Sequence, residues 1–195
     1  MSMQLSISKP LIDRVVPRSL VADIALIMAG ALLTAVSAQI AIPMWPVPIT
    51  GQTFAVLLVG SVLGASRGAI SMIAYFSMGA AGLPVFSGAA SGLTFGPTFG
   101  YLVGFIAAAG VIGWLSQLSW QKKAVGVAAS FLVGNAVIYL FGLSWLTFAL
   151  GNLGYANDLV SVFSAGLVPF LIGDAIKMTL AALALPMAWK YLGTK

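Results

Sequence analysis

The chain has 195 residues, of which 61% are hydrophobic and only 7% are charged. Soluble domains carry about 25% charged residues, so the composition excludes an ordinary soluble protein and indicates an integral membrane protein. Cysteine, histidine and glutamate do not occur in the sequence, which excludes disulfides, thiolate metal sites and catalysis by cysteine or histidine. At about 20 residues per span, the length allows about six helices and no second, soluble domain.

The first 19 residues are polar and basic, and they predict a cytoplasmic N-terminal segment, 1–19. The apolar run that follows predicts a retained first span at 20–42 rather than a cleaved signal peptide. Within this span, Ala31 and Ala35 form an i, i+4 pair on one helix face. Small residues let a partner helix approach closely in lipid, so this pair is a candidate docking surface, with internal packing as the alternative.

The next segment, 43–51, contains three prolines, which exclude a helix. It also contains Trp45, a residue type that is common at membrane interfaces. A loop of this length and content favours a cover over a site. Two short apolar helices are expected to follow at 52–64 and 68–81, and then an uncharged loop rich in Gly and Pro at 82–96.

The second half of the chain predicts three longer helices, at 97–120, 124–149 and 162–191. A polar loop at 150–161 separates the last two. The fold class predicted from these elements is all-α, an integral membrane protein with six transmembrane helices. They form a single substrate-binding domain over 20–195.

Basic residues predict the orientation of this bundle. All nine Lys and Arg residues except Lys177 fall on one side of the predicted membrane. They are Lys9, Arg14, Arg18, Arg67, Lys122, Lys123, Lys190 and Lys195. The loops at 43–51, 82–96 and 150–161 contain no Lys or Arg, so the positive-inside rule places them outside and both termini in the cytoplasm. The net charge of +5 is therefore a topology signal and does not indicate nucleic acid as a partner.

The exception, Lys177, shares the last apolar span with Asp174. Their i, i+3 spacing places them on one helix face. A charge at the centre of a membrane helix costs about 2.5–3.5 kcal/mol on insertion scales, so ionisable residues there are usually functional. The pair therefore predicts a ligand site, and a structural salt bridge within the helix is the alternative.

Other candidate site residues gather at the predicted outer face. Gln52 and Tyr101 lie in the first turns of helices that begin there, and the outer loops supply Trp45 and Phe86. These positions predict a pocket with polar groups below and an apolar, loop-covered mouth. Helix capping and interfacial anchoring are the alternatives for Gln52 and Tyr101. For Asn135, within the fifth span, the alternative is a hydrogen bond between helices.

Several short motifs occur in an order that resembles the BioY family, the biotin-binding S component of energy-coupling factor (ECF) transporters. They are Pro48-Ile49-Thr50-Gly51-Gln52-Thr53, Gly82-Leu83-Pro84-Val85-Phe86, Gly96-Pro97-Thr98, Gly100-Tyr101 and Gly173-Asp174-Ala175-Ile176-Lys177. The resemblance covers about residues 20–190. The chain departs from the family pattern at Phe99, where a second Gly is usual, and at Ile172, where Pro is frequent. The stretch 86–96 is shorter and lacks a site Asn, so its contacts are not carried over.

The resemblance implies that the site binds biotin. Lys177 would bind the carboxylate, and Asp174 would accept from the ureido N–H groups or hold the lysine. Asn135 and Gln52 can both donate and accept, which suits the ureido edges. Tyr101 and Trp45 would cover the bicycle.

The sequence has no Gly-x-x-x-x-Gly-Lys-Ser/Thr loop, so energy from ATP has to come from partners. The resemblance implies a transmembrane coupling subunit, the T component, and two ATPase subunits in a cell membrane of bacterial type. We therefore expect a transporter that is not an enzyme, with biotin as substrate and no cofactor. Three alternatives stay open: an S component for another vitamin, a proton-coupled transporter and an intramembrane enzyme.

Overall fold

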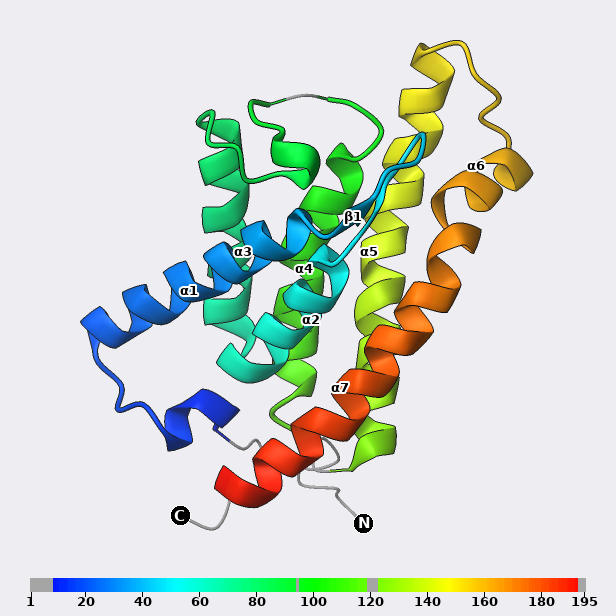
Figure 1. Ribbon diagram of the computed structural model, residues 1–195. Coiled ribbons are helices and arrows are strands. Elements are labelled where there is room, and N and C mark those ends of the chain that lie inside the picture. Colours follow the sequence, from blue (N-terminus) through cyan, green and yellow to red (C-terminus); the bar gives the residue numbers. More distant parts are fainter. Residues whose placement is uncertain (1–8, 94, 119–122, 193–195) are drawn as a thin grey trace, which may run out of the picture.

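The chain folds into one bundle of helices in the computed structural model, which describes residues 9–93, 95–118 and 123–192 (Figure 1). The α-helices are α1 (Leu20–Ala38), α2 (Gln52–Leu63), α3 (Ala65–Ala80), α4 (Phe99–Leu115), α5 (Ala124–Asn152), α6 (Leu159–Gly166) and α7 (Leu171–Leu192). Short 3-10 helices occupy η1 (Leu11–Arg14), η2 (Ser87–Ala89) and η4 (Val168–Phe170). Strands β1 (Ala41–Ile42) and β2 (Ile49–Thr50) pair as an antiparallel hairpin. The expected all-helical class is confirmed apart from this hairpin.

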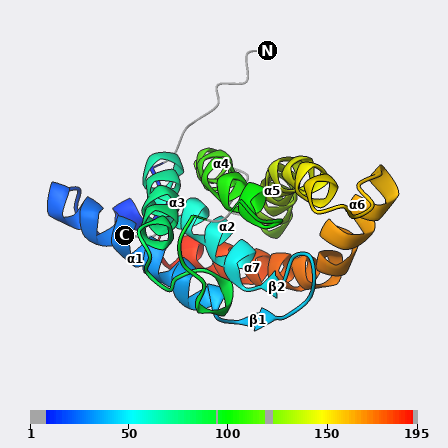
Figure 2. The same cartoon turned by 90° about the horizontal axis from the view of Figure 1, so that it is seen from above.

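Helix α2 lies in the middle of the bundle when the molecule is seen from above (Figure 2). It packs mainly against α4, α3 and α1. Small residues allow the close approach, because a Cβ added at Gly60 would lie 2.6 Å from the carbonyl oxygen of Ala109 on α4. The first turn of α2, which carries Gln52 and Thr53, is therefore held at a fixed place inside the bundle.

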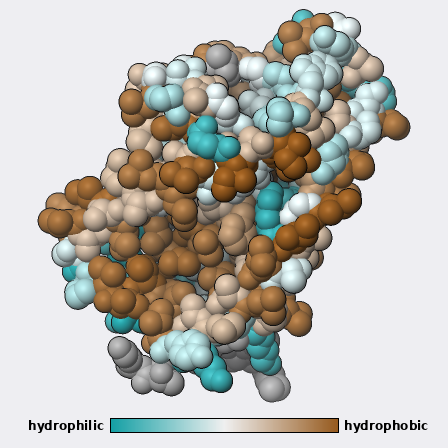
Figure 3. Space-filling view, viewed as in Figure 1, coloured by the Kyte–Doolittle hydropathy of each residue, from teal (hydrophilic) through white to brown (hydrophobic). Residues whose placement is uncertain are grey.

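Three segments among the described residues are long and apolar enough to cross a membrane. They are Leu20–Ala38, Ala124–Asn152 and Leu159–Leu192, the last of which joins α6 and α7. Helices α2 and α4 are apolar but shorter. Hydrophobic side chains cover most of the face that α1, α2 and α7 form in Figure 3. An exposed apolar surface of this extent suits contact with lipid and not with water.

The predicted last helix, 162–191, is wrong as one continuous element. The chain forms α6, leaves helical geometry at Leu167 (φ −127°, ψ −57°), passes through η4 and continues as α7. Pro169 lies in η4. It has no N–H for the helical hydrogen-bond ladder, and its ring disfavours a helical conformation in the residue before it. The break therefore has a local cause, and it places the start of α7 at Leu171.

The other predicted helices agree better with the structure. The predictions 52–64, 68–81 and 124–149 correspond to α2, α3 and α5. The first span, predicted at 20–42, ends at Ala38, because residues 41 and 42 pair in the hairpin. The predicted helix 97–120 begins at Phe99 and ends at Leu115, and residues 119 and 120 lie outside the described part.

The prediction that Ala31 and Ala35 form a docking surface is wrong. Both side chains are buried in the hydrophobic core. The buried face of α1 packs against α3 so closely that a Cβ added at Gly30 would lie 2.7 Å from Ser71 Oγ. The outward face of α1 carries larger side chains instead, including Leu32 and Val36. The alternative reading, internal packing, is confirmed for this pair.

The N-terminal segment is tied to the bundle at the end opposite the hairpin, where α7 also ends (Figure 1). Asp13 of η1 accepts from Arg18 at 2.6 Å and from Arg67 at 2.5 Å, and Arg67 also pairs with Asp23 of α1 at 2.8 Å. We call these four side chains the charge network. Of the predicted segment 1–19, residues 1–8 lie outside the described part of the chain, as do Lys122 and Lys195.

Candidate functional site

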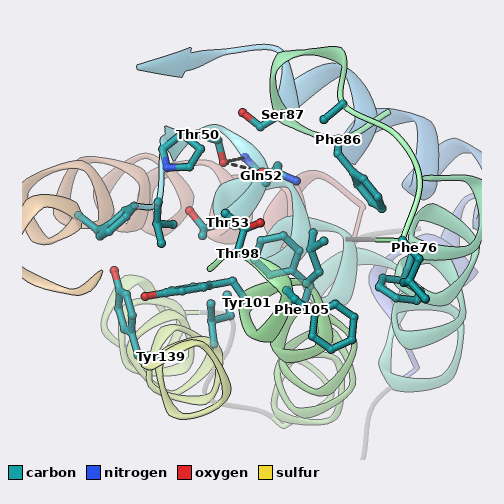
Figure 4. A pocket seen from close by; sticks show the side chains of 18 of the residues that line it. Thr50, Gln52, Thr53, Phe76, Phe86, Ser87, Thr98, Tyr101, Phe105 and Tyr139 are labelled. Atoms are coloured by element: carbon teal, nitrogen blue, oxygen red, sulfur yellow. Dashed lines mark hydrogen bonds between the residues drawn. The ribbon is translucent and has the colours of Figure 1, made fainter. Parts of the chain in front are cut away.

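A cavity of about 280 Å³ opens between the hairpin, the first turns of α2 and α4, and the loop that joins α3 to α4. Its lining residues come from seven parts of the chain, and Figure 4 draws most of them. They are Val47, Pro48, Thr50, Gln52, Thr53, Phe76, Phe86, Ser87, Ala90, Gly92, Leu93, Thr98, Phe99, Tyr101, Leu102, Phe105, Ile138, Tyr139 and Phe170. In Figure 4, polar Thr50, Thr53 and Tyr139 lie toward one end and aromatic Phe76 toward the other. The cavity therefore has a polar end and an aromatic end.

Lys177 stands behind the wall of the polar end. Its Nζ donates to the carbonyl oxygen of Thr50 at 3.0 Å, to Thr53 Oγ1 at 2.8 Å and to Asp174 Oδ1 at 3.3 Å. An ammonium group has three N–H donors, so all three are engaged. Thr50 and Thr53 line the cavity and Lys177 does not. The ammonium group of Lys177 is thus separated from the cavity only by Thr50 and Thr53.

Asp174 holds two partners at once. Its Oδ1 accepts from Lys177, and its Oδ2 accepts a short hydrogen bond from the Tyr139 hydroxyl. Tyr139 lines the cavity from α5. The side chains of Lys177 and Asp174 are 19% and 9% exposed, and such buried charges require partners of this kind. The structure therefore links the pair to the polar end of the cavity through Thr50, Thr53 and Tyr139.

Gln52 lies between the two ends, and its amide bonds two other side chains. Its Nε2 donates to the Tyr75 hydroxyl at 2.6 Å, and its Oε1 accepts from the Thr50 hydroxyl at 2.9 Å. The Tyr75 hydroxyl in turn donates to the carbonyl oxygen of Val85 at 3.2 Å. This chain of bonds joins the hairpin, α2, α3 and the loop after α3. It fixes the orientation of the Gln52 amide at the cavity wall.

The aromatic end is built from rings of three different elements. Phe76 of α3 has its ring centroid 6.4 Å from that of Phe86 and 6.1 Å from that of Phe99. Phe105, which follows Phe99 on α4 by nearly two turns, completes this wall. Such a surface accepts an apolar, ring-shaped group and offers it no hydrogen bonds.

Tyr101 lines the cavity with its ring and uses its hydroxyl elsewhere. The hydroxyl donates at 2.8 Å to the carbonyl oxygen of Gly166, the last residue of α6. A helix end leaves carbonyl oxygens without helical partners, and this bond satisfies one of them. Tyr101 therefore joins the wall of the cavity to the break between α6 and α7.

The structure brings only part of the predicted site to the cavity wall. Gln52, Phe86 and Tyr101 line it, whereas Asn135 and Trp45 do not. Asn135 is buried on α5, one turn before Tyr139. Trp45 is exposed at the turn of the hairpin, where its ring lies 4.4 Å from that of Tyr155 in the loop after α5.

Tyr139 is the main residue that sequence reasoning missed. It follows Asn135 at i+4, so the helical period alone places both on one side of α5. The described residues contain no group of three or more His, Cys, Asp or Glu side chains that could hold a metal ion.

The family model of the BioY family matches residues 5–194, nearly the whole chain. The chain belongs to the BioY family. Similar relatives include the biotin transporter BioY of Thermotoga maritima, 41% identical over 81% of this chain and 91% of that protein. Another is the biotin transporter BioY of Rhizobium etli, 40% identical over 71% of this chain and 75% of that protein. The family that the motifs resemble is thereby confirmed.

Among solved structures, the S-component for biotin from an ECF-type ABC transporter has a similar fold, with a TM-score of 0.72. The alignment covers 87% of this chain and 92% of that one at 24% sequence identity. Together with the long apolar helices, membership of the BioY family identifies a multi-pass protein of the cell membrane.

Proposed function

We propose that this protein captures biotin at the outer face of the cell membrane and serves as the substrate-specific S component of an ATP-driven ECF transporter. The named BioY relatives support biotin as the substrate. The observation that carries the proposal is the cavity, which pairs an aromatic end with a polar end backed by a buried lysine. Biotin has a similar division, with a carboxylate at one end and, at the other, a bicycle that is apolar apart from its ureido group.

In this proposal the biotin carboxylate lies at the polar end. Lys177 turns from the Thr50 carbonyl or the Thr53 hydroxyl toward the carboxylate, since all of its donors are engaged within the protein. A charge-assisted bond of this kind is worth about 1.5–3 kcal/mol, more than the neutral bond that it replaces. The bicycle then lies between Gln52 and the aromatic end, with its ureido group facing the Gln52 amide.

Asp174 acts in this proposal by positioning Lys177 and Tyr139. Both of its oxygens already accept hydrogen bonds from these residues. It keeps the lysine directed at the polar end, which was one of the two roles that the sequence left open. Asn135 lies one turn from Tyr139 and supports α5 from inside the bundle.

The energy for uptake comes from partner subunits in this proposal, a T component and a pair of ATPases. The positive-inside rule supports cytoplasmic termini, because Lys9, Arg14 and Arg18 precede α1 and Lys190 lies in the last turn of α7. η1 and the end of α7 lie at one end of the bundle and the cavity at the other, which fits a site that faces outward.

The test is calorimetric titration of the purified protein in detergent with biotin and, separately, with riboflavin and thiamine. We expect one biotin per chain and no heat of binding for the other vitamins. A protein that is monodisperse and folded but binds another vitamin instead would replace biotin as the substrate. No binding of any of them would contradict the proposed capture step.

A further inference from the structure

A second hollow lies against the outer wall of the cavity, between α4 and α5. It is an open groove of about 480 Å³, lined by Phe99, Gly100, Val103, Leu140, Phe141, Ser144 and Trp145. Leu140 and Phe141 are exposed on α5, one of the segments long enough to cross a membrane. In a multi-pass membrane protein, this groove therefore faces the hydrocarbon chains of the lipid.

Phe99 is the one described residue that lines both the cavity and the groove. Next to it, α4 and α5 touch through their backbones, since a Cβ added at Gly100 would lie 2.6 Å from the carbonyl oxygen of Phe141. The backbone contact continues one turn further, where a Cβ at Gly104 would lie 3.1 Å from the carbonyl oxygen of Ile138. Below Phe99, tight backbone packing closes the contact between α4 and α5. At the level of Phe99, the Phe99 ring alone separates the cavity from the groove.

The Phe99 ring is held in place by other rings. Its centroid lies 4.9 Å from that of Trp145, 5.0 Å from that of Phe95 and 6.1 Å from that of Phe76. The Trp145 ring is itself fixed, because its Nε1 donates to the carbonyl oxygen of Gly96 at 2.9 Å. Aromatic pairs at these distances stabilise one another beyond their burial. Phe99 is therefore a fixed partition.

We propose that Phe99 is a specificity-determining residue that separates the ligand cavity from the hydrocarbon of the membrane and keeps lipid chains out of it. The aromatic end of the cavity is apolar, so a lipid acyl chain can compete with any ligand for this space. Polar side chains do little to oppose its entry: Ser144 is the one hydroxyl residue among those that line the groove, and its hydroxyl donates to the carbonyl oxygen of Leu140. Exclusion thus depends on the volume and the position of the Phe99 ring.

The chain lacks cysteine, so a single reporter thiol can test this partition. Leu102 lines the cavity one turn beyond Phe99 on α4. The variant Leu102→Cys is placed in liposomes that contain a phospholipid with a maleimide at the end of one acyl chain. We expect no labelling by this lipid with Phe99 present, and labelling when Phe99→Ala is added. A water-soluble maleimide, applied from outside, should label the thiol in both proteins.

Two matched variants sharpen the result. Phe141→Ala removes a ring of the groove that does not line the cavity, so Leu102→Cys in this background should stay unlabelled by the lipid. Phe99→Tyr keeps the ring and should also keep the thiol protected. If Phe99→Ala reduces folding, Phe99→Leu provides a smaller apolar side chain at the same place.

Lipid labelling with Phe99 intact would overturn the proposal, and so would equal labelling in the Phe99→Ala and Phe141→Ala backgrounds. Protection that persists in both Phe99→Ala and Phe99→Leu would also overturn it. The proposal rests on the proposed function only in treating the cavity as the ligand site. The experiment contains no biotin, so its outcome is independent of whether the protein transports biotin.

Discussion

Two groups of paired charges, each built around a buried aspartate, lie at opposite ends of this bundle, and they differ in what surrounds them. The charge network joins Asp13, Arg18, Asp23 and Arg67, and each of its charges is matched by an opposite one in the protein. The Asp174–Lys177 pair is also balanced, but its remaining bonds go to Thr50, Thr53 and Tyr139, which line a cavity. The first group is complete within the fold, whereas the second is coupled to a space that a ligand can enter.

This comparison shows that burial of a charge does not by itself identify a functional site. Asp13 is as well buried as Asp174, with a side chain only 3% exposed. Through Arg67, its network connects η1, α1 and the first turn of α3, which is a structural task. The two groups differ in whether the residues that bond the charges also line a cavity, and not in the charges themselves. Variants at each group should therefore separate binding from stability.

The largest effect is expected for Lys177→Met, which keeps the length of the side chain and removes its charge. The carboxylate of biotin loses its partner and Asp174 is left without a cation, a change that costs about 3–5 kcal/mol at buried pairs. We expect biotin binding to weaken by about 100-fold or more, measured by calorimetry on folded protein.

The biotin amide, which lacks the negative charge, provides the control for Lys177→Met. The wild-type protein should prefer biotin to the amide, and Lys177→Met should bind both equally poorly. A folded Lys177→Met protein with wild-type affinity for biotin would exclude Lys177 as the carboxylate partner.

A smaller effect, on stability alone, is expected for Arg67→Met. The Arg67 side chain is 12% exposed and bonds both Asp13 and Asp23, so its loss should lower the free energy of unfolding by about 1.5–3 kcal/mol. Biotin affinity should not change, because the charge network lies at the far end of the bundle. Thermal unfolding with and without biotin measures both quantities.

Arg18→Met is the matched control for Arg67→Met, since the Arg18 side chain is 65% exposed. An exposed ion pair contributes about 0–1 kcal/mol. If Arg67→Met abolished biotin binding in a folded protein, the division between the two charge groups would be wrong.

The smallest effect concerns pH. Burial alone would raise the pKa of Asp13, but the hydrogen bonds and charges of Arg18 and Arg67 outweigh it and hold the pKa below its ordinary value of 3.8. A lowered pKa in the folded state adds stability above the ordinary value, and this stability is lost as the pH falls through the folded pKa. The melting temperatures of wild type and Asp13→Asn should therefore converge only below about pH 4. A difference that stays constant down to about pH 3 would contradict this linkage.

The sequence predicted the parts of this fold that depend on local pattern. Helices α2 and α5 are continuous apolar runs with clear ends, and their bounds agree with the prediction to within a few residues. The break after α6 was missed although Pro169 is a local signal, because the apolar run continues through it. The burial of Ala31 and Ala35 depends on which helix packs on which face, and small residues suit an inner and an outer contact equally well.

The sequence predicted the charged pair of the site but not the residues that lie between this pair and the cavity. Asp174 and Lys177 were singled out because charges are rare in apolar spans, yet the sequence could not tell that Thr50 and Thr53, more than 120 residues away, stand between them and the cavity. Asp23 and Arg67 were not recognised as partners, since 44 positions separate them and each lies at the edge of an apolar run. Contacts of this range are set by helix packing and not by spacing.

The break between α6 and α7 has a consequence for Asp174. Because α7 begins at Leu171, Asp174 lies in its first turn and not in the middle of a long helix. The aligned peptide dipoles give a helix N-terminus a partial positive charge, which stabilises a nearby carboxylate by about 0.3–1 kcal/mol and by up to about 2 kcal/mol in partly buried positions. This field remains when Lys177 turns toward a ligand. Through Pro169, the backbone itself provides Asp174 with a second source of positive potential, which stays in place throughout the binding cycle.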